Sequence, residues 1–251
     1  MEASRVRAEH GQAEYAASRV ASNGRRNEAL AHNGSWTGTS RQTASRVLSV
    51  LTASLMLVFA APLMLVIAVA IKLTSPGPIL FMQPRVGINR RNGGRPAGNC
   101  NRRVDHGGRP FRIFKFRTMY LSPNGPEPVW AEPDDPRVTP VGRFLRKFRL
   151  DELPQLFNVL SGDMDLVGPR PEQPKIFADL RSQIERYDER QRVRPGITGW
   201  AQVNQHYDNS IEDVRRKVEL DLEYIERKSV FEDMRILVKT VPVVIFKQGA
   251  W

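Results

Sequence analysis

Two adjacent carboxylates, Asp151 and Glu152, follow a strongly basic stretch of the chain. They lie in the segment RLDELPQLFNVL, and four cationic side chains precede them, Arg143, Arg146, Lys147 and Arg149. A carboxylate held among cations stays ionised near neutral pH, so it can attack phosphorus or hold Mg²⁺ against a diphosphate. Acidic residues are also favourable at a helix N-terminus. The pair therefore has both a catalytic and a purely structural interpretation.

Further downstream, the segment SGDMDLVGPRPEQP adds Asp163, Asp165 and Arg170 to the candidate polar residues. Arg170 stands between two prolines, which stiffen the backbone and favour a preorganised, bidentate phosphate contact. The sequence GPRP around Arg170 is equally compatible with an ordinary surface turn. Trp200, in ITGWAQVN, can stack on a base or lie at the depth of lipid headgroups, although a packed core tryptophan is the more common case.

Short elements must position these groups. The segment FRIFKFRTM alternates apolar and basic residues and predicts a half-buried strand that carries Lys115 and Arg117. After the acidic pair, apolar residues recur at helical spacing and predict a buried helix face, namely Leu153, Leu156, Phe157 and Leu160. Pro154 suits the first turn of that helix, with Asp151 as its cap. Similar periodicity predicts helices over 176–184 and 211–225, and RPGITGWAQVN is expected to form a structured loop between them.

One segment is apolar enough to enter a membrane. Residues 47–71 contain no charged side chain, and Arg46 and Lys72 flank them. Their length suffices to cross a hydrocarbon core about 30 Å thick. Pro62 near the middle predicts a break or kink, and both flanks are basic, which favours the cytosol on both sides. A re-entrant helix satisfies both observations, whereas a single span with a kink remains the alternative.

Composition limits the possible functions. The formal charge of +11 indicates an anionic partner, which could be nucleic acid, lipid headgroups or a phosphorylated substrate. A single cysteine excludes an intrachain disulfide and a thiolate metal cluster. The chain also lacks the Gly-rich phosphate loop, the dinucleotide fingerprint, H-E-x-x-H and G-x-S-x-G.

The expected architecture is α+β. It comprises a disordered basic tail over 1–46, a proline-broken, re-entrant membrane helix over 47–72, and a compact cytosolic domain over 73–251. That domain should consist of amphipathic helices and short β-hairpins, with an exposed polar insertion at about 91–110. The apolar run near the C-terminus is too short to span, so it should lie on the membrane or pack on the domain.

Taken in order, these segments resemble the bacterial sugar transferase family, the monotopic polyprenyl-phosphate phosphoglycosyl transferases. The matching stretches are the membrane segment, FMQPRVG, FRIFKFRTM, DDPRVTPVGRFLRKFRLDELPQLFNVLSGDMDLVGPRP and RPGITGWAQVN. The ending KTVPVVIFKQGAW is similar to that of compact exopolysaccharide-initiating members. The insertion is longer than usual, RVLSV lacks an acid that members commonly have, and Ala61 replaces their serine before the proline.

The resemblance implies that a sugar 1-phosphate moves from a UDP-sugar to undecaprenyl phosphate while UMP leaves, which initiates exopolysaccharide or surface-glycan synthesis. A hexose, galactose or glucose, is the favoured sugar. Asp151 would be the nucleophile of a covalent aspartyl-phosphosugar intermediate, and Glu152 together with Asp151 would hold Mg²⁺. The residues that would bind substrate are Lys115, Arg117, Arg146 and Arg170.

The same resemblance places the protein on the cytosolic face of the bacterial inner membrane. Its expected partners are the UDP-sugar, undecaprenyl phosphate, membrane lipids and downstream glycosyltransferases; a homo-oligomer is compatible with it, and nucleic acid is not expected. The rival hypothesis is a non-catalytic, membrane-anchored basic binding or scaffold protein. Electrostatic binding alone gives no reason for acidic residues to interrupt the basic surface.

Overall fold

The computed structural model describes four stretches of the chain, residues 37–89, 107–121, 135–205 and 210–245. Contacts divide the chain into two compact units, residues 1–43 and 44–251, and the account below concerns the second. The described elements are mixed helices and short strands, so the α+β prediction is confirmed. Most of the predicted tail and insertion, residues 1–36 and 91–106, lie outside the described residues.

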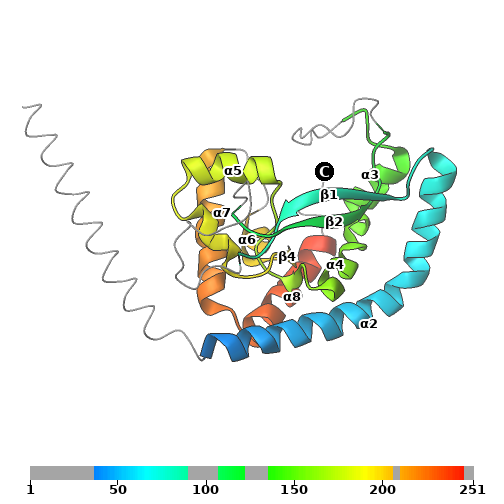
Figure 1. Ribbon diagram of the computed structural model, residues 1–251. Helices are drawn as coiled ribbons and strands as arrows, with labels where there is room; N and C mark the ends of the chain where they lie inside the picture. Colours follow the sequence, from blue (N-terminus) through cyan, green and yellow to red (C-terminus); the bar gives the residue numbers. More distant parts are fainter. Residues whose placement is uncertain (1–36, 90–106, 122–134, 206–209, 246–251) are drawn as a thin grey trace, which may run out of the picture. The chain divides into compact units, whose positions relative to one another are not determined.

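The long apolar helix is α2, Thr37–Thr74. It begins ten residues before the expected membrane segment, so residues 37–46, which were predicted to be disordered, are helical. Its assignment continues through Pro62, because one proline can bend a helix without ending it. Figure 1 shows the bend, and the second half of α2 rises beside the rest of the domain. By length and composition, Thr43–Thr74 could cross a membrane.

Four short strands form two separate sheets. Their bounds are β1, Leu80–Val86, β2, Pro110–Phe116, β3, Asp165–Val167, and β4, Gly196–Thr198. β1 and β2 pair antiparallel, from Leu80 opposite Phe116 to Val86 opposite Pro110. β3 and β4 pair parallel, a pairing that the predicted short β-hairpins did not include. Parallel strands need a crossover between them, and here helical segments supply it.

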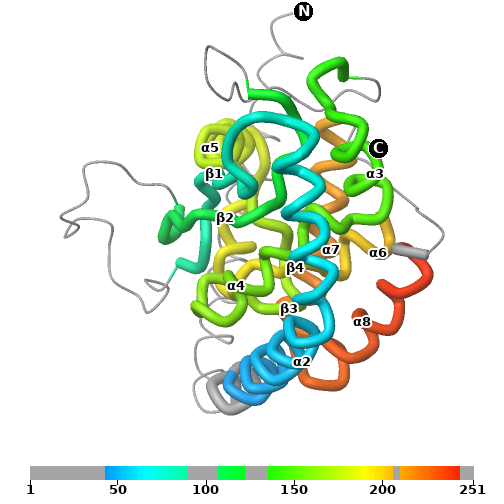
Figure 2. The backbone as a smooth tube through the Cα atoms, turned by 90° about the vertical axis from the view of Figure 1, so that its right-hand side faces the viewer, coloured from blue at the N-terminus to red at the C-terminus, as the bar shows by residue number. Residues whose placement is uncertain are grey.

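Helices surround these sheets. Their bounds are α3, Pro140–Lys147; η1, a 3₁₀ turn, Leu150–Glu152; α4, Gln155–Ser161; α5, Pro174–Gln183; η2, Tyr187–Arg192; α6, Trp200–Asn204; α7, Ile211–Arg227; and α8, Val230–Ile245. The helices predicted over 176–184 and 211–225 are confirmed as α5 and α7. The expected loop at RPGITGWAQVN instead contains β4 and α6. Figure 2 shows α2 and α8 on one side of the domain.

The buried face of α4 differs from the predicted one. Phe157 and Leu160 are exposed, whereas Leu156, Asn158 and Val159 are buried. Asn158 turns inward because its amide satisfies backbone groups of β2. An apolar pattern alone could not anticipate a buried asparagine, since periodicity counts only hydrophobic positions.

Two arginines, Arg46 and the buried Arg117, tie both ends of α2 to the domain. Near the first end, the Arg46 guanidinium donates to Met164 O at 2.7 Å and to the Asp165 carboxylate at 3.1 Å. Near the second, Arg117 donates to the carbonyl and hydroxyl of Ser75, at 2.8 and 2.7 Å. Both ends of the apolar helix therefore contact the same domain.

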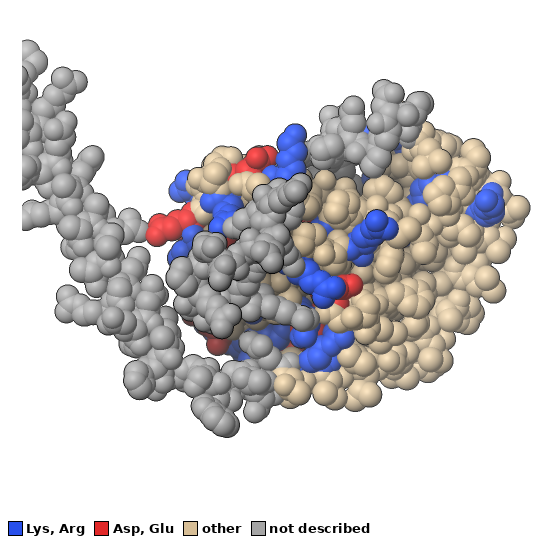
Figure 3. Space-filling view, viewed as in Figure 1, with Lys and Arg blue, Asp and Glu red and all other residues tan. Residues whose placement is uncertain are grey.

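Apolar contacts support the same arrangement. Ala53 belongs to the central core cluster, while Ile67 and Ile71 pack with Phe116 and Leu145 in a second cluster. Most other apolar side chains of α2 remain exposed, and the space-filling view shows a largely uncharged surface on the side where α2 lies (Figure 3). An exposed apolar patch of this kind marks an interaction surface, and a lipid phase is the natural partner for a helix of this length.

The C-terminal helix α8 also has two faces. Ile236 is fully buried in the central core, whereas Phe231, Val238 and Val241 are exposed. The prediction that this segment packs on the domain is confirmed for the described part of the helix. Its outer face keeps the apolar character that suits a membrane surface.

Candidate active site

The carboxylate pair lies in the 3₁₀ turn η1, between α3 and α4. Arg149 just before it has a left-handed backbone, φ 54° and ψ 21°, which reverses the chain after α3. Pro154 occupies the N-cap position of α4, and neither helix start has a side-chain cap hydrogen bond. The prediction that Asp151 caps the following helix was therefore wrong. Because Asp151 and Glu152 are only 8% and 9% exposed, their burial needs another explanation.

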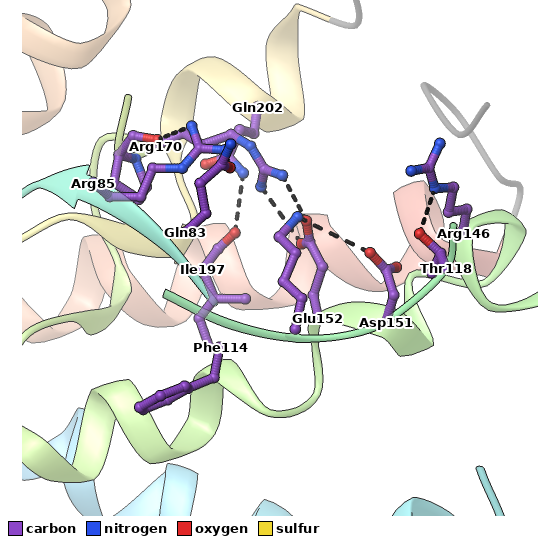
Figure 4. A network of polar contacts seen from close by, with 12 residues as sticks. Gln83, Arg85, Phe114, Thr118, Arg146, Asp151, Glu152, Arg170, Ile197 and Gln202 are labelled. Atoms are coloured by element: carbon purple, nitrogen blue, oxygen red, sulfur yellow. Dashed lines mark hydrogen bonds and ion pairs between the residues drawn. The ribbon is translucent and has the colours of Figure 1, made fainter. Parts of the chain in front are cut away.

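Glu152 is the centre of an ion-pair network (Figure 4). Its Oε1 lies 2.8 Å from Lys115 Nζ and 2.5 Å from Arg170 Nη2. Burial by itself raises the pKa of Glu152, but the charges of Arg170 and Lys115 outweigh it and hold the pKa well below its ordinary value. Glu152 is therefore ionised at neutral pH, and its carboxylate is already in contact with the side chains of Lys115 and Arg170.

Asp151 has a different environment. Lys115 Nζ is 4.0 Å from its Oδ2, and its carboxylate forms no hydrogen bond with the part of the chain that the structure describes. Burial raises the pKa of Asp151; Lys115 lowers it, and the neighbouring Glu152 charge raises it. The Asp151 carboxylate is therefore the less stabilised and more available of the two, which is what a nucleophile requires.

On the other side of Asp151 lies Arg146 (Figure 4). Its Nε donates to Thr118 Oγ1 at 2.9 Å, so the guanidinium has a fixed position. Burial lowers the pKa of Arg146, whereas the charge of Asp151 raises it. Asp151 therefore has a cation on each side, Lys115 and Arg146, and can approach an anionic substrate with less repulsion.

Close backbone packing places α3 and Arg146. Thr139 caps the helix, because its hydroxyl accepts from Gly142 N at 2.8 Å. A Cβ atom added at Gly142 would lie 2.0 Å from Thr118 O, so only glycine allows this approach. The same backbone stretch carries the Thr118 hydroxyl that holds Arg146.

A buried asparagine positions the strand that carries Lys115. Asn158 Oδ1 accepts from Phe114 N at 2.9 Å, and Asn158 Nδ2 donates to Arg112 O at 2.7 Å. These two bonds join α4, which follows the carboxylate pair, to β2. They fix Lys115 relative to Glu152 by hydrogen bonds that do not involve either charged group.

Two further arginines hold the loop around Arg170. Arg190 is buried, donates to Arg170 O at 3.1 Å and pairs with Asp221 at 2.7 Å. Arg85 donates to Pro171 O at 3.1 Å. Neither arginine was singled out from the sequence. An arginine that interrupts the apolar strand in FMQPRVG was a usable signal for Arg85, whereas the sequence offered none for Arg190.

Other predicted residues lie elsewhere. Arg117 is buried against the 75–76 turn, so the structure does not bring it to the carboxylate pair and gives it an architectural position. Asp165 pairs with Arg46 and Lys228, each at 3.1 Å. Its carboxylate therefore binds one cation from α2 and one from the end of α7.

Asp163 and Trp200 also have ordinary structural surroundings. Asp163 accepts a hydrogen bond from a serine hydroxyl at 3.0 Å. Trp200 is 9% exposed and belongs to the core, where its Nε1 donates to Glu223 at 3.2 Å. Arg235 and Lys239 lie over its ring, 4.9 and 4.5 Å from the centroid. The packed-core interpretation of this tryptophan is confirmed.

Among the described residues, the site offers a divalent cation two carboxylates, those of Asp151 and Glu152. Within the described stretches, no group of three or more His, Cys, Asp and Glu side chains could hold a metal. Mg²⁺ commonly uses one or two carboxylates and completes its octahedron with water and substrate phosphates. Asp151, whose oxygens have no hydrogen-bond partner in that same part of the chain, and the adjacent Glu152 fit such a partial donor set.

Comparison with known proteins adds independent information. The family model described as "Bacterial sugar transferase" matches residues 40–247. The chain is 41% identical over 208 residues to the "UDP-glucose:undecaprenyl-phosphate glucose-1-phosphate transferase" of Caulobacter vibrioides, covering 82% of this chain and 71% of that protein. It is 44% identical to the "Undecaprenyl-phosphate glucose phosphotransferase" of Komagataeibacter xylinus, covering 80% of this chain and 36% of that protein.

A third relative differs in its named sugar. The "UDP-N-acetylgalactosamine-undecaprenyl-phosphate N-acetylgalactosaminephosphotransferase" of Aeromonas hydrophila is 42% identical over 205 residues, which are 82% of this chain and 44% of that protein. The chain thus spans less than half the length of two of these three relatives. The shared region includes the carboxylate pair and the cations around it.

Proposed function

The chain belongs to the bacterial sugar transferase family, and from this premise we propose that it transfers a sugar 1-phosphate from a UDP-sugar to undecaprenyl phosphate. UMP is the second product. The observation that carries the proposal is the contrast between two adjacent carboxylates. Glu152 is bound by two cations, whereas Asp151 lies between Lys115 and Arg146 with no hydrogen-bond partner among the described residues.

In the first step, an Asp151 oxygen attacks the sugar-bearing phosphorus of the UDP-sugar. A bond forms between that oxygen and phosphorus, and the bond from phosphorus to the oxygen that bridges the two phosphates breaks. UMP leaves with the bridging oxygen and its electron pair, so no proton is required. Phosphoryl transfer depends mainly on positioning and on neutralising charge, and Lys115, Arg146 and Arg170 supply both.

In the second step, an oxygen of the lipid phosphate attacks the same phosphorus. The bond to Asp151 breaks, the carboxylate is restored, and the sugar is left on a lipid diphosphate. Arg146, fixed by Thr118, lies on the opposite side of Asp151 from Glu152 and Arg170. We assign Arg170 and Lys115 to the diphosphate of the UDP-sugar donor and Arg146 to the incoming lipid phosphate, so that each anion has its own cations.

Mg²⁺ is the cofactor that we assign to this site. Asp151 and Glu152 would hold it together with phosphate oxygens, and it would neutralise charge on the diphosphate. Glu152 already binds Lys115 and Arg170, so these cations would keep its carboxylate oriented while metal and donor arrive.

For the membrane segment we propose the re-entrant arrangement, on the cytosolic face of the inner membrane. Arg46 and Arg117 attach the two ends of α2 to one domain through hydrogen bonds, partly buried at Arg46 and buried at Arg117. A helix that crossed the bilayer would separate these ends by about 30 Å of hydrocarbon. A domain that holds both ends is therefore hard to reconcile with a single span. One substrate is lipid-embedded and the other is water-soluble, so this placement brings them together.

Topology can be tested by cysteine labelling. In a Cys100→Ser background, a cysteine at position 35 and one on the exposed surface of α7, Glu219→Cys, should react with impermeant reagent only after inside-out exposure of the membrane. Labelling of position 35 from the periplasmic side alone would reject the re-entrant proposal.

The sugar is proposed to be a hexose, with glucose before galactose. Two of the relatives above carry glucose in their names, and one carries N-acetylgalactosamine. The lipid-linked product then requires further glycosyltransferases that extend it, which makes this reaction the first step of a surface glycan.

The reaction is tested by UMP release from membranes that contain the protein. Release from UDP-glucose should require both undecaprenyl phosphate and Mg²⁺ for continued turnover, and Asp151→Asn should abolish it. Glu219→Gln, at an exposed position of α7, serves as the matched control and should keep full activity. A panel of UDP-sugars identifies the substrate; unchanged turnover by Asp151→Asn would remove Asp151 as the nucleophile.

A further inference from the structure

Two buried polar atoms, in residues of β1 and α6, lack partners within the described residues. They are the amide oxygen Gln202 Oε1 and the guanidinium nitrogen Arg85 Nε. A buried polar atom without a hydrogen bond costs about 1–3 kcal/mol, so such atoms are uncommon in folded proteins. When one acceptor and one donor of this kind occur together, a ligand or an ordered water is the ordinary explanation.

Both atoms have fixed orientations. Gln202 Nε2 donates to Ile197 O at 3.0 Å, and the flipped amide would place oxygen against that carbonyl oxygen, so Oε1 must point the other way. The Arg85 guanidinium donates from Nη1 to Pro171 O and from Nη2 to Gln83 Oε1, at 3.1 and 2.7 Å. Its Nε–H is the part of the group that remains without a partner.

Their location connects them to the active site. Figure 4 shows Gln83, Arg85, Arg170 and Gln202 gathered on one side of Glu152, away from Arg146 and Thr118. Burial lowers the pKa of Arg85, and the charges of Glu172, Arg170 and Glu152 act on it as well. Arg85 and Gln202 therefore lie on the side of Glu152 that is assigned to the donor diphosphate.

The chemistry of the two atoms restricts what can bind there. An amide oxygen only accepts hydrogen bonds, so it repels a phosphate oxygen and requires an O–H or N–H donor. The Nε–H of arginine only donates, so it requires an acceptor. A hydroxyl group satisfies both at once, and nucleotide sugars carry hydroxyls next to their diphosphate.

We propose that Gln202 and Arg85 form a subsite that binds a hydroxyl of the nucleotide-sugar donor, beside Lys115 and Arg170, which bind its diphosphate. This inference rests on the proposed function for the identity of the donor. The hydroxyl can come from the sugar or from the ribose, and the test separates these sources. A bridging water that stays when donor binds is the outcome that would overturn the subsite.

The test compares the wild type with Gln202→Met, which has nearly the same size but no amide. Binding of UDP-glucose and UMP is measured by calorimetry on the full-length protein in nanodiscs, and kcat/KM is measured by UMP release. We expect Gln202→Met to weaken UDP-glucose binding and lower kcat/KM by about 10-fold, the usual effect of losing one neutral hydrogen bond. Gln183→Met, on the exposed face of α5, is the matched control and should equal the wild type.

Singly deoxygenated UDP-glucose analogues identify the hydroxyl. If the hydroxyl belongs to the sugar, one analogue should bind the wild type about 10-fold more weakly than UDP-glucose does. The affinity for that analogue should not fall further in Gln202→Met, and the affinity for UMP should be the same in both proteins. If it belongs to the ribose, UMP binding itself weakens in the variant. The affinities of the wild type for the UDP-glucose analogues, UMP, deoxy-UMP and UDP-glucose can be compared without any variant. The hydroxyl that binds can therefore be identified even if Gln202→Met does not fold.

Two results would overturn the subsite: binding by Gln202→Met within twofold of the wild type for every ligand, or an equal loss for every ligand, with deoxy-UMP and all the deoxygenated UDP-glucose analogues included. Failure of the proposed function has a different signature. In that case the wild type would release no UMP with undecaprenyl phosphate and Mg²⁺, whatever the calorimetry shows.

Discussion

The two neighbouring carboxylates should change stability in opposite directions when each loses its charge. Asp151 is buried with no hydrogen bond in the described part of the chain, so its charge opposes folding. Asp151→Asn should therefore stabilise the protein by about 1 kcal/mol, within the range common for relieved active-site strain. Glu152→Gln should destabilise it, because Lys115 and Arg170 would both lose their carboxylate partner.

The second magnitude follows from the contacts of Glu152. Breaking a buried ion pair costs about 3–5 kcal/mol when one partner remains charged. The side chains of Lys115 and Arg170 are 20% and 32% exposed, so water compensates part of the loss and about 2–3 kcal/mol is expected. For a domain of this size, 1 kcal/mol corresponds to about 2–4 °C in Tm. Asp151→Asn should thus melt a few degrees higher and Glu152→Gln roughly 4–12 °C lower at pH 7.5.

The pH dependence of these differences has a defined sign. Because the pKa of Asp151 is raised in the folded protein, the protonated carboxyl favours folding. This stabilisation is complete below the ordinary pKa of 3.8 and is lost as the pH rises through the pKa of the folded state. The advantage of Asp151→Asn should therefore shrink as the pH falls toward 4. Glu152 has a lowered pKa, so its contribution persists at pH 5 and disappears only below its ordinary value of 4.5.

The assay is thermal unfolding in one detergent, followed by tryptophan fluorescence, with Glu219→Gln as the matched exposed control. That control should stay within about 0.5 kcal/mol of the wild type. Equal signs for Asp151→Asn and Glu152→Gln at pH 7.5 would refute the assignment of one free and one ion-paired carboxylate.

Three further variants test the elements that position the site. Gly142→Ala places a Cβ 2.0 Å from Thr118 O, so it should lower stability by about 1–3 kcal/mol and reduce turnover; an unchanged Tm would contradict the close approach. Asn158→Leu leaves two backbone groups of β2 unpaired and should cost about 2–4 kcal/mol, measured by Tm, whereas a loss below 0.5 kcal/mol would show that β2 is held otherwise. Arg190→Lys keeps the charge but loses the donor to Arg170 O, so KM for the UDP-sugar should rise several-fold; a changed kcat with unchanged KM would argue against this positioning role.

Sequence reasoning singled out the acidic pair from the charges that precede it, and the family resemblance pointed to Lys115, Arg146 and Arg170, which the structure places around the pair. The sequence did not predict the contacts of Arg117, because alternation along a strand indicates the face on which a residue lies but not the groups that its side chain contacts. The Arg117 guanidinium binds the 75–76 turn, 41 residues earlier. Sequence reasoning also made Asp151 a helix cap, because the left-handed residue Arg149 and the 3₁₀ turn depend on how α3 packs.

Long-range polar contacts were the least predictable part of the site. Asn158 bonds backbone groups 44 and 46 residues away. No local pattern signals such contacts, since they follow from the tertiary arrangement and not from propensity. The parallel pairing of β3 with β4 escaped prediction for the same reason, because three-residue strands carry almost no periodic signal.

The central claim is that Asp151 becomes covalently bound to the sugar phosphate. The most direct measurement is mass spectrometry of the peptide over residues 150–170 after rapid quenching of the protein with UDP-sugar and Mg²⁺, without lipid phosphate. A mass increase equal to the sugar phosphate should map to Asp151, disappear on addition of undecaprenyl phosphate, and be absent from Asp151→Asn. An adduct on Glu152, or one that persists in Asp151→Asn, would contradict the assignment.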